Sequence, residues 1–303
     1  MKTLPILLPG DCVEIIAPAS RCSDVELKVL QELLSSWRLN PIVDADLFGK
    51  DLLCSHTDIR RAELLNQALS RRGTKAIICA RGGYGSLKLI PSLMRLPQPK
   101  TFKWFVGMSD VTALHLFFQQ QWQWPVIHGA ADPGRFSAPS IATLKSLLFG
   151  EISQLEWAAR PLNLAAEANL SFQAPVTGGN LTLVQTSIGT AWQLQGAGKI
   201  IVLEEVGERG YRLDRMLEHL RQASLLQGVR ALIFADFLQG DEPDGSSLIQ
   251  PVLARFAETC AIPVLQIQGV GHGHVNLPMI MGTEGVLQLG RDAKLVCTKK
   301  QVA

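Results

Sequence analysis

The stretch FVGMSDVTALH, residues 105–115, runs from strand-forming residues through Gly-Met-Ser-Asp straight into a helical pattern. A strand that turns sharply into a helix is the repeating unit of an α/β sheet. A serine at such a turn, here Ser109, can be lifted clear of the sheet edge as in a nucleophile elbow. Val111 stands where that motif has its second glycine, so helix capping by Ser109 or Asp110 is the alternative.

Strand and helix patterns alternate on both sides of this stretch. Ser23 and Glu26 have the spacing of a capping box, which predicts a helix over 23–37. The pattern predicts a largely parallel sheet flanked by helices. Strands are expected at 12–19, 40–45, 75–80, 199–205 and 229–237, and further helices at 57–71 and 211–223.

The length of 303 residues suggests two domains. Residues 151–175 have mixed periodicity and two prolines, which indicates a linker. We therefore expect an N-terminal domain over 1–150, with a mostly parallel sheet. A smaller α/β or α+β domain is expected over 176–303, with the active site at the interface.

The composition is that of a globular protein, with 47% hydrophobic and 18% charged residues. A net charge of +2 gives no indication of a basic surface for nucleic acid. Arg60 and Arg61 are expected to be solvent-exposed. No uncharged apolar run approaches the length of a membrane span, which predicts no membrane partner. The cysteines form no C-x-x-C pair, and MKTLPILLPGD lacks the features of a signal peptide. These features predict a cytoplasmic protein.

Four stretches whose residues could take part in catalysis or binding follow predicted strands. Open α/β sheets bind ligands at these strand ends. The four stretches are ARGGYGS (80–86), GMSD (107–110), LEEVGE (203–208) and GVGHGHVNLP (269–278). Backbone N–H groups of the glycine-rich turn could face an anion or an oxyanion. A flexible turn is the alternative, and neither a dinucleotide fingerprint nor a P-loop is present.

The acidic and histidine stretches leave several readings open. Strand alternation predicts that one of Glu204 and Glu205 points inward and the other outward. Salt bridges to Arg209, Arg212 or Arg215 are the alternative to a catalytic role. His272 and His274 could supply a general base or metal ligands. His128, at another strand end, could line the cleft. His115 and His219 are expected to be packing or surface residues.

These stretches, taken in order, resemble the LD-carboxypeptidase family of serine peptidases, which includes the microcin C immunity peptidases. Further matching segments are HGA at 128–130 and GGNLTLV at 178–184. The resemblance implies a Ser-His-Glu triad of Ser109, Glu204 and His274. It favours His274 over His272 because the Gly-His-Val step at 273–275 fits the family pattern best.

The resemblance also implies an oxyanion hole from the N–H groups of Gly83 and Asp110. It suggests substrate binding by Arg81 and Tyr84, with neither a metal nor another cofactor. Its departures are Met108, where an aromatic residue is expected, a shorter loop after His274, and the second imidazole of His272.

The implied substrate is a cytoplasmic murein tetrapeptide, which would lose its terminal D-alanine, and the implied assembly is a homodimer. A cation must hold the terminal carboxylate, and Arg81 or an arginine of 209–215 is expected to do so. The alternative within the family is an immunity peptidase that hydrolyses an aminoacyl-nucleotide. Outside it, the alternatives are a non-catalytic binder of small anions and a metal-dependent hydrolase that uses His272 and His274.

Overall fold

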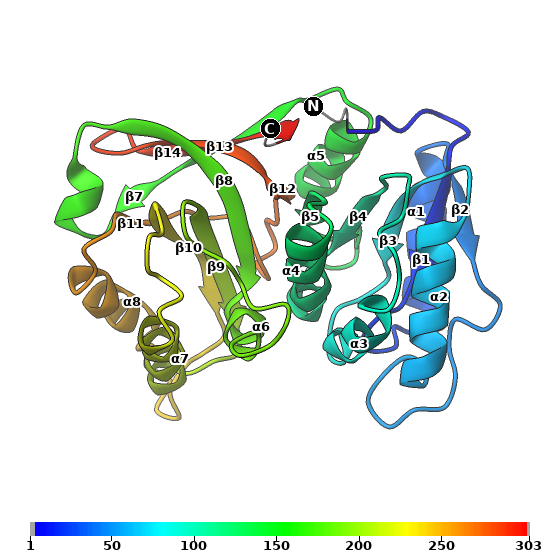
Figure 1. The fold of residues 1–303 in the computed structure, drawn as a ribbon, viewed down its shortest axis with the longest axis horizontal. Helices are drawn as coiled ribbons and strands as arrows, with labels where there is room; N and C mark the ends of the chain where they lie inside the picture. The colour runs from blue at the N-terminus through cyan, green and yellow to red at the C-terminus, as the bar shows by residue number, and fades with distance from the viewer. Residues whose placement is uncertain (1–3, 302–303) are drawn as a thin grey trace.

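The computed structural model describes residues 4–301 and shows two α/β lobes side by side (Figure 1). The first lobe has a six-stranded sheet in the order β12-β5-β4-β3-β1-β2. The five strands from the first half of the chain are parallel, as predicted. They are β1 (Cys12–Ile16), β2 (Asn40–Val43), β3 (Thr74–Cys79), β4 (Trp104–Gly107) and β5 (Val126–His128).

Helices cover both faces of this sheet because its strands bury side chains on both faces. Ile77 and Phe105 pack in one cluster with α2, α3 and α4, whereas Ile78 and Val106 pack in another with α1 and α5. The predicted capping box of Ser23 and Glu26 is confirmed at the start of α1. The helices are α1 (Asp24–Ser36), α2 (Asp58–Ser70), α3 (Ile90–Leu93), α4 (Thr112–Gln121) and α5 (Ala138–Leu148), with short 3-10 helices η1 (Ser86–Leu89) and η2 (Ser109–Val111).

The second lobe contains a mixed eight-stranded sheet in the order β6-β14-β13-β8-β9-β10-β11-β7. The long strand β8 (Ser171–Asn180) runs parallel to β9 (Ile200–Val206) and antiparallel to β13 (Thr283–Gln288). The other strands are β6 (Gln154–Ala158), β7 (Arg160–Pro161), β10 (Ala231–Leu238), β11 (Val264–Gln266) and β14 (Lys294–Gln301). The helices are α6 (Leu181–Thr186), α7 (Gly210–Gln222) and α8 (Ile249–Glu258), with the 3-10 helix η3 (Leu164–Glu167).

Two segments differ from the predicted domain division. Residues 151–175 are not a free linker, because they form β6, β7 and the first part of β8 in the second sheet. In addition, β12 (Met279–Met281) returns to the first sheet and pairs antiparallel with β5. A short edge strand that contains Pro161 shows little alternation of apolar and polar residues. The sequence pattern therefore resembled that of a linker.

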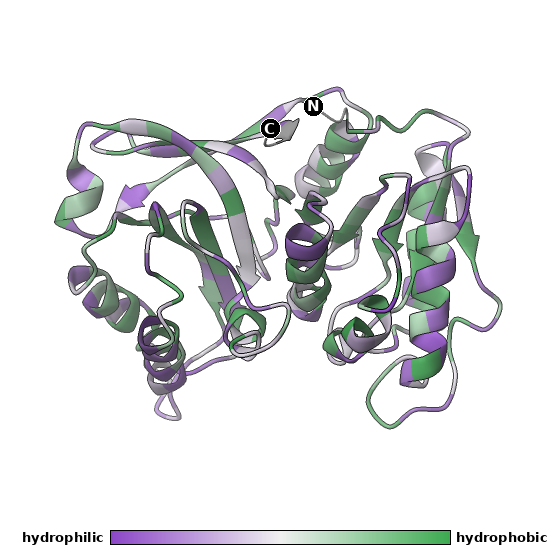
Figure 2. Ribbon diagram, in the orientation of Figure 1, coloured by the Kyte–Doolittle hydropathy of each residue, from purple (hydrophilic) through white to green (hydrophobic). Residues whose placement is uncertain are grey.

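The two lobes share a continuous apolar core. Helix α4 lies between the two sheets (Figure 1), and Phe117 of this helix belongs to the same cluster as Val184 and Ile201 of the second lobe. Figure 2 shows the apolar residues gathered on the inner strands. A polar contact crosses the same boundary, since the N–H of Asn180 donates to Oγ1 of Thr112 at 3.1 Å. A large apolar interface restrains relative motion of the lobes.

Within residues 4–301, no helix combines the length and the apolar character needed to cross a membrane.

Candidate active site

Ser109 occupies a strained turn at the carboxyl end of β4. Its φ angle is 61°, a left-handed conformation that costs an L-residue about 1–2 kcal/mol. Its side chain does not cap the following helix, because η2 begins without a side-chain capping bond. Among residues 4–301, no hydrogen bond is found for its hydroxyl group. The capping alternative is therefore wrong for Ser109, and strain of this kind is typical of functional sites.

Asp110 fastens the serine turn to the glycine-rich turn. Its buried carboxylate accepts hydrogen bonds from the N–H groups of Gly85 at 3.2 Å and Ser86 at 2.7 Å. The hydroxyl of Ser86 donates in return to the carbonyl of Asp110 at 2.6 Å. The side chain of Asp110 thus caps η1 rather than α4, which leaves its own backbone N–H beside Ser109.

The glycine-rich turn lies directly against Ser109. A Cβ atom on Gly82 would lie 2.8 Å from the Cβ of Ser109, so only glycine fits there. The N–H of Ser20 donates to the carbonyl of Gly82 at 3.2 Å, and the N–H of Tyr84 donates to Oγ of Ser20 at 3.1 Å. Between these two anchored residues, the N–H of Gly83 has no acceptor within residues 4–301. A backbone N–H group that is fixed in position and has no acceptor can donate a hydrogen bond to an oxyanion.

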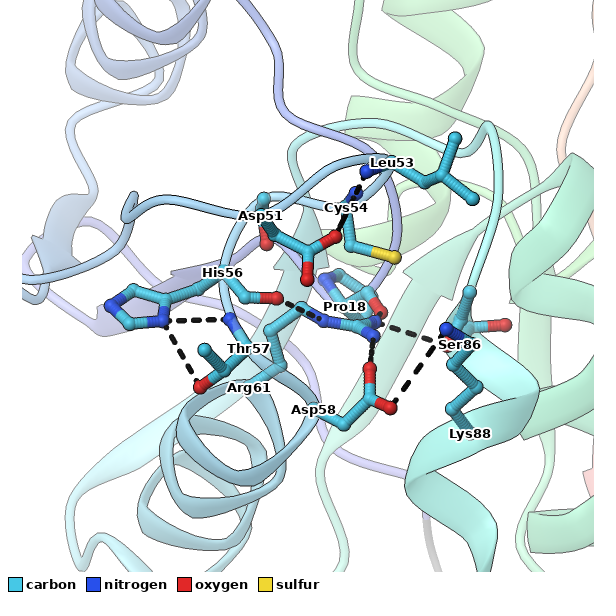
Figure 3. Close-up of polar contacts among 12 residues, drawn as sticks. Pro18, Asp51, Leu53, Cys54, His56, Thr57, Asp58, Arg61, Ser86 and Lys88 are labelled. Atoms are coloured by element: carbon cyan, nitrogen blue, oxygen red, sulfur yellow. Dashed lines mark hydrogen bonds and ion pairs between the residues drawn. The ribbon is translucent and has the colours of Figure 1, made fainter.

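Arg61 supports the same turn through its guanidinium group, which Figure 3 shows among Pro18, His56 and Asp58. Its side chain is fully buried and donates to the carbonyls of Pro18, His56 and Gly85, the last at 3.0 Å. It also pairs with the carboxylate of Asp58. The expectation of a solvated Arg60–Arg61 pair is therefore wrong for Arg61. The available signal was the apolar spacing of Ala62, Leu65 and Leu69 on the same helix.

The acidic pair on β9 is buried on both sides of its strand. Glu204 and Glu205 are 1% and 4% exposed, so the prediction that one of them points outward is wrong. Both faces of this strand are covered, so alternation along it does not bring either side chain to solvent. Glu205 accepts hydrogen bonds from Asn180 at 2.9 Å and from the N–H and hydroxyl of Thr182 at 2.8 and 2.7 Å. Burial, followed by the nearby charge of Glu204, raises the pKa of Glu205.

The predicted alternative of salt bridges between this pair and the neighbouring arginines is wrong. Arg209 pairs with Glu242 instead, and Arg212 pairs with Glu208. Glu204 is therefore left free to contact a histidine.

The histidine in contact with Glu204 is His272. Its Nδ1 atom lies 2.6 Å from Oε2 of Glu204, and its side chain is 3% exposed. The loop can approach this closely because residue 271 is glycine. A Cβ atom at this position would lie 2.8 Å from the same oxygen. Among residues 4–301, Nδ1 is the atom of His272 with a hydrogen-bond partner, and Nε2 is left available.

The structure corrects the predicted pairing of Glu204 with His274. The His274 side chain is exposed, and its Nδ1 atom lies 3.3 Å from the carbonyl oxygen of Arg135. The carbonyl of His274 accepts from the N–H of Ser137 at 2.8 Å, so this residue fastens the histidine loop to residues 135–137. The two imidazoles are separated by one glycine and face different partners, which the Gly-His-Val pattern could not reveal.

Residues of both lobes line one cavity of about 540 Å³. Ser109 and the glycine-rich turn enter it from the first lobe, and Val206, Gln239 and His272 from the second. The predicted nucleophile and the imidazole paired with Glu204 therefore face a common space between the lobes. Arg81, Glu26, Asp132 and Arg135 add charge to its wall.

Tyr84, predicted to bind substrate, does not line this cavity. Its side chain is 44% exposed, and Nζ of Lys88 lies 5.5 Å from the centre of its ring. Arg81 does line the cavity, but its guanidinium lies 3.4 Å from the carboxylate of Glu26.

The metal-dependent alternative finds no support in the geometry. Within residues 4–301, no group of three histidine, cysteine or acidic side chains is arranged to hold a metal ion. Nδ1 of His272 and Nδ1 of His274 also have different partners.

Known families match both lobes. The model of the LD-carboxypeptidase N-terminal domain matches residues 13–129, and that of the LD-carboxypeptidase C-terminal domain matches 173–287. A putative carboxypeptidase of Rickettsia conorii is 38% identical, over 94% of this chain and 90% of its own length. The murein tetrapeptide carboxypeptidase of Pseudomonas aeruginosa is 27% identical, over 92% of this chain and 94% of its own length.

A solved structure shows the same fold. The microcin C7 self-immunity protein superposes with a TM-score of 0.84 at 17% identity, and the match covers 100% of both chains.

Proposed function

The chain belongs to the LD-carboxypeptidase family and is a peptide-bond hydrolase of the serine type, and we propose that it removes the terminal D-alanine of a murein tetrapeptide. The observation that carries this proposal is the meeting of two features in one cavity. Ser109 stands on a left-handed turn, and His272 is held by Glu204 with Nε2 unused. Acyl transfer to a serine uses an exposed hydroxyl and an imidazole oriented by a carboxylate, and both groups line this cavity.

In the proposed reaction, Oγ of Ser109 attacks the carbonyl carbon that precedes the terminal residue. Nε2 of His272 accepts the hydroxyl proton, and the carboxylate of Glu204 stabilises the resulting imidazolium through Nδ1. His272 then gives this proton to the departing amine of D-alanine as the C–N bond breaks. Water, deprotonated by His272, hydrolyses the ester on Ser109 and regenerates the enzyme.

The N–H groups of Gly83 and Asp110 are the proposed donors to the tetrahedral oxyanion. Gly83 has a free N–H between two anchored residues, and Asp110 follows the nucleophile at the start of η2, where N–H groups have no intrahelical partner. Loss of one such donor costs about 10²–10³-fold in kcat.

The terminal carboxylate of the substrate requires a cation in the cavity. Arg81 shares its charge with Glu26, and the arginines of α7 do not line the cavity. Arg135 lines it and, among residues 4–301, has no ion-pair partner. We therefore assign the carboxylate to Arg135, with Arg81 as the second cation. Guanidinium groups match carboxylates by paired hydrogen bonds.

Two further elements of the proposal come from the resemblance to the family. They are the cytoplasmic location and the homodimer, which cell fractionation and light scattering of the purified protein test. The murein peptide itself is the substrate in the name of the Pseudomonas aeruginosa relative.

The proposal is tested by mass spectrometry of a murein tetrapeptide incubated with wild type and with Ser109→Ala. We expect wild type to release D-alanine and the variant to release none while still binding the peptide. The same peptide with a terminal L-alanine is the control for the stereochemistry. Release of an amino acid from an aminoacyl-nucleotide, with the tetrapeptide left intact, would overturn the murein assignment. Binding without turnover of either substrate would instead favour a non-catalytic binder.

A further inference from the structure

One oxygen of the key carboxylate has no hydrogen bond. Oε2 of Glu204 contacts His272, whereas Oε1 is buried and has no partner within residues 4–301. A buried carboxylate oxygen without a donor is costly, by about 1–3 kcal/mol or more. Nε2 of His128 lies 3.7 Å from this oxygen.

His128 is itself fully buried and unpaired. It is 0% exposed, and neither ring nitrogen has a hydrogen-bond partner in the described part of the chain. Burial lowers the pKa of His128, an effect that nearby His272 adds to and that Glu204 opposes. A neutral imidazole carries one N–H, on either nitrogen. On Nε2, that hydrogen would sit on the ring atom that lies 3.7 Å from the unpaired oxygen of Glu204.

The position of His128 makes the contact relevant to the nucleophile. His128 is the last residue of β5, in register with Gly107 of β4, two residues before Ser109, and with Met279 of β12. Glu204 and His272 belong to the second lobe. A bond from His128 to Glu204 would therefore join the sheet that carries the nucleophile to the acid–base pair.

We propose that His128 is a positioning residue, which donates its Nε2–H to Oε1 of Glu204 and so fixes the carboxylate that orients His272. At 3.7 Å the bond is open, and apo catalytic hydrogen bonds commonly tighten only when substrate binds. The kinetic consequence of this inference rests on the proposed function, whereas the direction of the His128 proton does not.

Two variants of His128 and one matched control test the kinetic consequence. His128→Phe keeps a ring but removes the donor, and His128→Gln returns an N–H donor at a similar reach. His115→Phe removes another fully buried, unpaired imidazole, whose ring centre lies 6.2 Å from that of His128. We expect kcat for the tetrapeptide to fall about 10–100-fold in His128→Phe, as for a misplaced catalytic group. KM should change less than about threefold in this variant.

His128→Gln should restore most of kcat, and His115→Phe should retain it. An unchanged kcat in His128→Phe, or an equal loss in both His128 variants, would overturn the proposal.

A measurement on the unmodified protein covers the case in which His128→Phe fails to fold. The ¹⁵N shifts of labelled histidine rings report which nitrogen carries the proton, and His128→Gln assigns the signal. We expect the Nε2–H tautomer for His128. The Nδ1–H tautomer would refute the proposal even if the enzyme cleaves the tetrapeptide. Nε2–H in a protein that cleaves no tetrapeptide would count against the proposed function alone.

Discussion

Oε2 of Glu204 lies 2.6 Å from Nδ1 of His272, and this carboxylate and imidazole come from segments 68 residues apart in the chain. Glu204 lies on β9, and the loop that carries His272 follows β11. The carbonyl oxygen of Val270 accepts from the N–H of Asp236 at 3.1 Å, and the N–H of Gly269 donates to the carboxylate of Asp236 at 3.1 Å. The loop is thus anchored just before the histidine, so the imidazole is oriented before any substrate arrives.

Replacement of Glu204 by Gln should lower kcat by about 10⁴-fold, because an amide cannot fix the imidazole tautomer or stabilise the imidazolium. Its neighbour gives a matched control. Glu205→Gln removes a carboxylate that contacts Asn180 and Thr182 rather than His272, so it should lower the melting temperature while kcat falls less than about tenfold. Steady-state release of D-alanine and thermal melts measure both. Equal losses of kcat in the two variants would contradict the assignment.

The left-handed backbone conformation of Ser109 should lower the stability of the folded protein. A left-handed L-residue costs about 1–2 kcal/mol, which glycine avoids. Glycine also raises the conformational entropy of the unfolded chain, which offsets about 0.4–1 kcal/mol of that gain. The free energy of unfolding should therefore be larger for Ser109→Gly than for Ser109→Ala, by roughly 0.5–1 kcal/mol. Both variants are inactive, so urea denaturation compares them without regard to catalysis. A lower value for Ser109→Gly would mean that the turn is not strained.

The buried His115 should make stability depend on pH. Burial, followed by the nearby His128, holds the pKa of His115 well below its usual range. An unfolded histidine titrates near ~6.5. Below that pH the unfolded chain binds a proton that the folded state excludes, so stability falls as pH falls.

We therefore expect the difference in unfolding free energy between wild type and His115→Phe to be constant above pH ~6.5. Below it, wild type should lose about 1.4 kcal/mol per pH unit relative to the variant. Urea denaturation between pH 8 and pH 5 provides the comparison. Parallel curves over the whole range would show that His115 titrates in the folded protein at the same pH as in the unfolded chain, which would contradict the lowered pKa.

Arg135→Ala should weaken binding of the terminal carboxylate. A charged hydrogen bond contributes about 1.5–3 kcal/mol, so KM for the tetrapeptide should rise roughly 10–150-fold while kcat changes little. The same peptide with a C-terminal amide has no carboxylate, and the variant should then differ little from wild type. Arg81→Ala is the comparison, with a smaller effect expected because Glu26 shares its charge. Equal KM values for Arg135→Ala and wild type on the tetrapeptide would remove Arg135 from the site.

Local patterns predicted much of the fold, because each depends on neighbouring residues. The capping box at Ser23 and the parallel strands of the first lobe are examples. The return of β12 to the first sheet depends on a partner more than 150 residues away, which short-range periodicity cannot encode.

The site shows the same division. The strand ends that carry Ser109, Glu204 and the histidine loop could be predicted, since ligands bind at the carboxyl ends of parallel strands. The choice between His272 and His274 could not, because it depends on how a glycine-containing loop folds against Glu204. For Arg61, the apolar spacing of its helix was a signal of burial, but the carbonyl partners at Pro18 and Gly85 that make a buried arginine possible are set by the tertiary fold.

The most direct test of the account compares release of D-alanine from murein tetrapeptide by His272→Ala and His274→Ala, with equal folding shown by melting curves. Loss of a triad histidine costs on the order of 10⁶-fold in kcat. The account predicts such a loss for His272→Ala and a change below about tenfold for His274→Ala, whose side chain contacts the carbonyl of Arg135. Full activity in His272→Ala, or its abolition only in His274→Ala, would contradict the assignment of the general base.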